Sequence, residues 1–87
     1  MPIHFVLQGG ESAEVYSPGS ADSAPVVYRF HVERFVDAEL KIVREGESSK
    51  IIPAGSTIRT LDVGATQNLF IEAVGSGFVA GWYDAVS

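Results

Sequence analysis

Cysteine is absent from the 87-residue chain, so neither a disulfide nor a thiolate metal site can hold it together. This excludes a small secreted scaffold of the disulfide-rich kind. Basic residues are also scarce, with 6 lysines and arginines against 11 acidic residues and a formal net charge of −5. Such a chain is a poor electrostatic partner for a phosphate backbone, so nucleic-acid binding is not expected. A chain of this length predicts a single domain, residues 1–87, stabilised by packing and by oligomerisation.

Long apolar runs are missing as well. No run approaches the roughly 20 residues that a membrane-spanning helix needs, so no association with a membrane is expected. Residues 1–5 lack a basic segment followed by an apolar one, and no signal peptide is predicted. We therefore expect synthesis in the cytoplasm, or export by a route that needs no signal.

Residue types that carry chemistry are few. Histidine occurs only as His4 and His31, whereas a zinc site needs three or four ligands. His31 shares a strand face with Glu33, but this arrangement is typical of the solvated face of an amphipathic strand. Asp22 and Asp37 stand apart from other calcium-ligand residues, and no serine or glycine cluster matches a nucleophile elbow or a phosphate-binding loop. We predict no catalytic residue, no metal and no cofactor, and thus no enzyme.

Apolar residues recur with a period of two along almost the whole chain, which is the pattern of β-strands. Glycine and proline mark the turns, with the longest loop at residues 18–25 and a tight turn at residues 53–56. The pattern predicts an all-β fold, a small antiparallel β-sandwich of about eight short strands, with a jelly roll among the topologies that fit. The predicted core consists of Val26, Tyr28, Phe30, Val32, Leu40, Ile42, Leu69, Ile71, Phe78 and Trp82.

The C-terminal segment, residues 68–86, predicts a hairpin that is apolar on both faces. Gly75 and Ser76 suit a two-residue turn that matches strand twist. One face would cover the core, and a second apolar face calls for a partner, because contiguous exposed apolar patches usually mark interaction sites. A cover by the N-terminal strand or by the 18–25 loop is the alternative. The candidate interface, through which we expect a dimer or a trimer, consists of Phe70, Val74, Val79 and Tyr83.

Three segments resemble small structural proteins of tailed bacteriophage virions: the turn Pro53-Ala54-Gly55-Ser56-Thr57, the strand at residues 69–73 and the strand at residues 79–83. Proteins of this kind are short, poor in cysteine and rich in β-structure, and many are head decoration (cement) proteins. The resemblance implies a virion structural protein that oligomerises, binds the major capsid protein and stabilises the head shell. It also implies location on the capsid surface after synthesis in the host cytoplasm. It transfers no site residues.

A ligand- or carbohydrate-binding module for host attachment is the alternative hypothesis. Trp82 and Tyr83 are its aromatic candidates, but alternation along a strand places their rings on opposite faces. Tyr16 and Tyr28 stay open as contributors elsewhere. A neighbouring gene for a major capsid protein would favour the virion hypothesis, and a neighbouring gene for a tail fibre would favour attachment.

Overall fold

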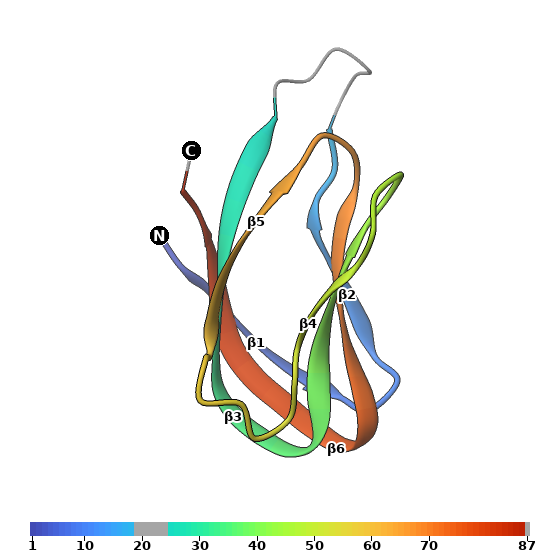
Figure 1. The fold of residues 1–87 in the computed structure, drawn as a ribbon, viewed down its shortest axis with the longest axis vertical. Helices are drawn as coiled ribbons and strands as arrows, with labels where there is room; N and C mark the ends of the chain where they lie inside the picture. The colour runs from blue at the N-terminus through green and yellow to red at the C-terminus, as the bar shows by residue number, and fades with distance from the viewer. Residues whose placement is uncertain (19–24, 87) are drawn as a thin grey trace.

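Two long strands, β3 (Val26–Arg44) and β6 (Leu69–Ala85), organise the fold. They pair with each other in antiparallel orientation along nearly their whole length. In the computed structural model, which describes residues 1–18 and 25–86, both strands bend together near their middles (Figure 1). The sheet that they carry therefore folds back on itself.

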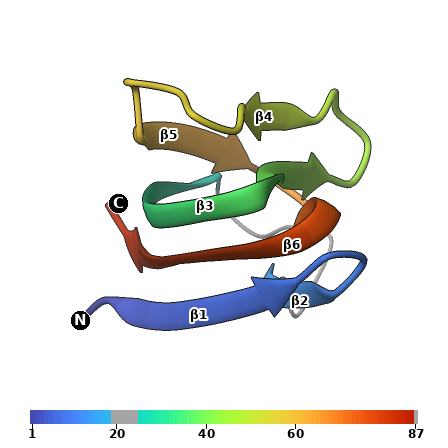
Figure 2. The ribbon, with the colours of Figure 1, turned by 90° about the horizontal axis from the view of Figure 1, so that it is seen from below.

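Four shorter strands complete this antiparallel sheet: β1 (Ile3–Gln8), β2 (Ser12–Tyr16), β4 (Lys50–Ile52) and β5 (Thr60–Ala65). Strands β1 and β2 pair with β6 on one side, while β4 and β5 pair with β3 on the other (Figure 2). On one side of the bend, β2 and β4 flank β6 and β3, and we call this part the β2/β4 half. On the other side, β1 and β5 flank the same two strands and form the β1/β5 half.

The prediction of an all-β antiparallel fold is confirmed, with a different strand count. Six strands are found in place of about eight, because the predicted strands at 26–33 and 38–45 are both part of β3 and the two strands of the predicted C-terminal hairpin are both part of β6. The predicted hairpin is wrong for the same reason, since β6 runs through Gly75 and Ser76 without reversing. Most of the predicted 18–25 loop lies outside the described residues. No described residue is helical, so that part of the chain holds no helix able to cross a membrane.

The bend depends on a bulge in β6 and on two glycines of that strand. At the register shift between Val36 and Ala38, Asp37 of β3 (φ 50°) lies opposite two residues of β6, Ser76 and Gly77, so β6 carries the extra residue, and such bulges bend a strand. Gly75, the partner of Ala38, has φ 145°, a backbone conformation that favours glycine. A Cβ atom on Gly77 would collide with the carbonyl oxygen of Val36. Both strands can therefore turn without losing their pairing.

The core lies between the two halves of the folded sheet. Because β6 is a single strand, its odd-numbered residues point inward on both sides of the bend. Six of the ten predicted core residues are confirmed as buried, whereas Val26 and Tyr28 are half-buried. For Phe78 and Trp82 the core prediction is wrong: both are half-buried and point outward from β6, whose odd-numbered residues point inward. The largest fully buried side chains are Phe30, Val32, Leu40, Ile42, Leu69, Ile71 and Val79.

Candidate functional site

The four residues of the predicted interface do not share one surface. Val79 is 0% exposed and Tyr83 is 8% exposed, so both belong to the core. The Tyr83 ring lies 6.0 Å from the Phe30 ring between centroids, and burial raises the pKa of the Tyr83 hydroxyl. Phe70 and Val74 lie on the outer face of the β2/β4 half. As a group, the predicted interface is therefore wrong, and the cause is the hairpin turn that β6 does not make.

The outer face of the β2/β4 half is rich in charge. Between Phe70 and Val74, Glu72 points outward and pairs in register with Lys41 of β3. Phe70 itself lies opposite Glu14 of β2. Charged side chains thus interrupt the apolar ones, as on an ordinary solvated sheet surface.

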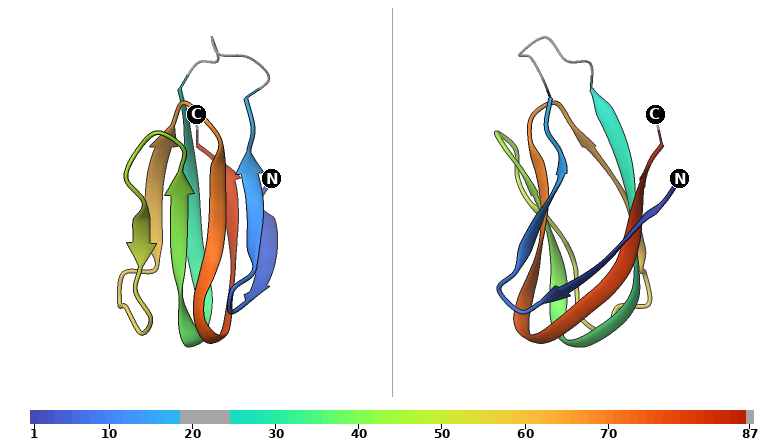
Figure 3. Two further views of the ribbon diagram at one scale, coloured as in Figure 1. Left: turned by 90° about the vertical axis from the view of Figure 1, so that its right-hand side faces the viewer. Right: turned by 180° about the vertical axis from the view of Figure 1, so that it is seen from behind.

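The outer face of the β1/β5 half differs sharply in composition. Three outward residues of β6, namely Phe78, Ala80 and Trp82, follow one another without an intervening charge. Their partners on β1 and β3 form three rows across the sheet, on the face where β1 and β6 run side by side (Figure 3). The rows are Gln8–Phe78–Val36, Val6–Ala80–Arg34 and His4–Trp82–His31, and we call these nine residues the Trp82 block.

Contacts within the block hold its rings in place. The His31 and Trp82 rings lie 5.4 Å apart between centroids, at an interplanar angle of 31°. His31 Nδ1 lies 2.8 Å from Thr60 Oγ1 of β5, which fixes the imidazole beside the indole. The Arg34 guanidinium lies 5.7 Å from the centre of the Phe78 ring, within the range of a cation–π contact. Apart from Arg34, none of the nine residues carries a permanent charge.

Polar pairs surround the block. His4 Nδ1 lies 3.6 Å from Glu33 Oε1, and the N-terminal ammonium group of Met1 lies 3.3 Å from Asp84 Oδ1. Arg29 donates two hydrogen bonds to Asp62, at 2.9 and 3.1 Å, and these lower the pKa of the Asp62 carboxyl group. All these pairs are solvent-accessible and add little to stability. An apolar and aromatic centre with a polar rim is the usual anatomy of a protein–protein interface.

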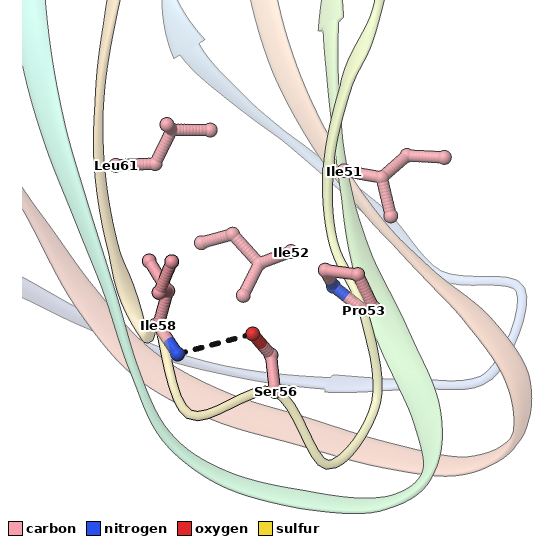
Figure 4. Close-up of a pocket in the computed structure, with 6 residues that line it drawn as sticks. All are labelled: Ile51, Ile52, Pro53, Ser56, Ile58 and Leu61. Carbon is pink, nitrogen blue, oxygen red and sulfur yellow. Dashed lines mark hydrogen bonds between the residues drawn. The ribbon is translucent and has the colours of Figure 1, made fainter.

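A separate apolar pocket of about 290 Å³ lies beside the edges of β4 and β5 (Figure 4). Its only polar side chain is Ser56, whose hydroxyl oxygen accepts a hydrogen bond from the Ile58 amide at 3.1 Å. No titratable side chain lines it, so the pocket suits an apolar group and offers no acid, base or charged nucleophile. It is lined by Ile51, Ile52, Pro53, Ser56, Ile58 and Leu61.

The sequence did not predict the Trp82 block, because the predicted hairpin reverses which side chains of residues 78–85 face the core and which face outward. Had residues 69–85 been taken as one strand, the even-numbered positions would have placed Phe78, Ala80 and Trp82 on one outer face. Tyr16 and Tyr28, with ring centroids 6.0 Å apart, belong to the partly buried aromatic residues next to the core and not to this block. Within residues 1–18 and 25–86, no cluster of three or more metal-ligating side chains occurs.

Comparison with protein-family models, with curated proteins and with solved structures finds no match for this chain. The geometry of the block and the composition of the chain are therefore the basis on which a function can be proposed.

Proposed function

We propose that the chain is a non-enzymatic structural protein that assembles with copies of itself through the Trp82 block. The observation that supports this most strongly is the contrast between the two outer faces of one folded sheet. The outer face of the β2/β4 half alternates charged and apolar residues, whereas the block gathers Trp82, Phe78 and Val6 around a single arginine.

Burial of this block on association would be favourable. Val6 is 63% exposed in the monomer, and Phe78 and Trp82 remain partly accessible. Removing apolar surface from water stabilises a complex by about 25 cal/mol per Å² of area buried. Tryptophan, tyrosine and arginine are enriched among the residues that dominate the binding energy of interfaces, and the block contains two of these types, Trp82 and Arg34.

The specific form of this proposal is a decoration (cement) protein of a bacteriophage head. The resemblance of three chain segments to small virion proteins supports this form, and so does the acidic, cysteine-free composition. The partner would be the major capsid protein, the oligomer would be a dimer or a trimer, and the location would be the capsid surface. A gene for a major capsid protein beside the gene for this chain would support the assignment, and a tail-fibre gene there would favour host attachment.

Placing a charge in the block should prevent self-association. We expect Phe78→Glu to sediment as a folded monomer at concentrations where the unmodified chain forms oligomers, because a buried carboxylate is costly at an interface. Within one chain, the new carboxylate would meet Arg34 and remain solvated, so folding should be preserved. Sedimentation equilibrium, with far-UV circular dichroism to verify folding, measures this.

Phe70→Lys is the matched control. Phe70 is the same residue type on the same strand, it is also half-buried, and its new ammonium group would meet Glu14. This variant should associate like the unmodified chain. A monomeric unmodified chain at high concentration, or equal association by both variants, would refute self-association through the block.

Carbohydrate binding is a second candidate function, favoured by one observation. Trp82 lies between His4 and His31, so an aromatic ring is flanked by hydrogen-bonding side chains on an open sheet face. A screen on immobilised glycans tests this candidate. Retention that disappears in Trp82→Ala but persists in Phe70→Ala would favour it over self-association.

A further inference from the structure

The free edge of β1 differs from the other three free edges of the sheet. Among the described residues, β1 pairs only with β6, and its opposite edge is open. An open edge is a template for another strand unless charge, proline, a bulge or short length blocks it. Strand β1 has none of these within residues 3–8, and Ile3 and Val6 on it are 54% and 63% exposed.

The other three edges are each protected. Strand β2 carries Glu14 and has a register shift directly after it. Strand β4 has only three residues, begins with Lys50 and is followed by Pro53. Strand β5 has Asp62 at its centre, in an ion pair with Arg29. Strand pairing with a partner is therefore expected at β1 and not elsewhere.

One hydrogen bond shows which amide and carbonyl groups of β1 point away from β6 and toward the open edge. The Gly9 amide donates to the Gly77 carbonyl at 2.7 Å, so Gly9 is bonded toward β6. In an antiparallel pair, bonding toward the neighbour alternates along the strand. The amide and carbonyl groups of His4, Val6 and Gln8 therefore point to the open edge.

Only two of these three residues are available to a partner. The Gln8 amide donates to Glu11 Oε1 at 2.7 Å, and the Gln8 carbonyl accepts from the Glu11 amide at 2.9 Å. At the other end, Pro2 has no amide hydrogen to donate. The open ladder is thus limited to His4 and Val6.

We propose that β1 pairs with β1 of a second copy, antiparallel and centred on Phe5. This inference rests on the proposed self-association and adds a second contact to it, because edge pairing leaves both Trp82 blocks uncovered. The edge contact uses the backbone groups of only two residues from each copy, so it should hold only where burial of the blocks also stabilises the assembly. In this register His4 of each copy exchanges two hydrogen bonds with Val6 of the other, so all free groups are used. In the same register Pro2, which has no amide hydrogen, lies opposite Gln8 of the second copy, whose backbone groups are already bonded to Glu11. A register centred on Val6 would require Gln8 to abandon Glu11.

The pairing joins the outer faces of the two copies. The two copies would be related by a two-fold axis that passes through the Phe5 pair and is perpendicular to the sheet, as in an isologous interface. Such an axis keeps the outer faces of both copies on the same side of the joined sheet. His4 and Val6 then bring the two Trp82 blocks into one surface that crosses the dimer. On the inner side, Phe5 would lie next to its own copy, and Ile3 would lie next to Leu7.

Disulfide trapping tests this register, because the chain has no cysteine of its own. Phe5 would face its copy as a non-hydrogen-bonded pair, with Cα atoms about 4.5 Å apart, which is within the range that a disulfide spans. Under mild oxidation, Phe5→Cys should form a covalent dimer at least about tenfold faster than Val74→Cys, an exposed position on the other half that reports random collisions. Val6→Cys, although more exposed than Val74→Cys, should not exceed this background rate.

Each outcome is informative. Faster linking by Val6→Cys would overturn the proposed register, and equal rates for all three variants would overturn pairing at β1. If sedimentation shows oligomers while Phe5→Cys does not link, self-association stands and this inference fails. Should Phe5→Cys not fold, Val6→Pro provides the second test. It removes an edge amide that makes no bond within the chain, so it should leave a folded protein that cannot form the β1 dimer, and an unchanged dimer would contradict the inference.

Discussion

Replacing Phe30 by alanine is expected to lower the free energy of unfolding by about 3–5 kcal/mol. Phe30 is 0% exposed and lies on β3 opposite Leu61 of β5 and Tyr83 of β6. Removing its ring would leave a cavity between the halves of the folded sheet, where the surrounding strands cannot collapse freely. A small domain is stable by only about 5–15 kcal/mol, so the variant should unfold at much lower urea concentration.

Trp82→Ala is the control that separates core from surface. Trp82 is larger than Phe30, but it lies on the outer face beside His31, and its loss should cost about 1–2 kcal/mol. Urea unfolding at a protein concentration where both variants are monomeric measures the difference. Equal destabilisation by the two substitutions would mean that Trp82 is in the core and that the alternation of β6 is not continuous.

Replacing Gly77 by alanine is expected to cost about 3 kcal/mol or more, although it adds one methyl group. The new Cβ atom would collide with the carbonyl oxygen of Val36, which belongs to the backbone of β3 opposite the bulge in β6. Relief would require the two long strands to separate where the sheet bends, and both halves depend on that pairing. Loss of the β-sheet circular dichroism spectrum, or a large drop in melting temperature, would be the readout.

Gly64→Ala is the matched control for this bend. Gly64 also lies within a strand and also lacks a positive φ, but its Cβ atom would lie 3.7 Å from the nearest heavy atom, the Val26 carbonyl oxygen. This variant should keep nearly the stability of the unmodified chain. If Gly77→Ala were equally well tolerated, the close approach of the strands at the bend would be refuted.

Local patterns were sufficient to predict much of the fold. Alternation correctly placed Phe30 and Val32 inward and Glu33 outward, because side-chain direction in a strand depends only on position along it. The turn at residues 53–56 was also predictable. Gly55 has φ 73°, and the Ser56 amide donates to the Pro53 carbonyl at 3.1 Å, so glycine occupies the third position of the turn, where a positive φ is required.

The course of β6 at Gly75 could not be predicted from local pattern. A glycine followed by serine suits a hairpin turn as well as a bend, and the choice depends on β3, which is paired with β6 on both sides of the bend. That long-range pairing decides which of Phe78 and Val79 is inside. The hairpin turn predicted at Gly75 and Ser76 therefore places Trp82 in the predicted core and Tyr83 in the predicted interface, and both placements are wrong.

Fluorescence of Trp82, the only tryptophan in the chain, reports on the environment of the Trp82 block. We expect the block to be exposed on the single chain and to become buried when copies assemble. In dilute solution acrylamide should quench the emission, and quenching should fall with a shift to shorter wavelength as concentration rises through the association range. The Phe78→Glu variant should keep the dilute behaviour throughout. Emission that is protected from acrylamide at every concentration would show that Trp82 is buried in the monomer, and equal quenching in monomer and oligomer would show that assembly does not bury the block.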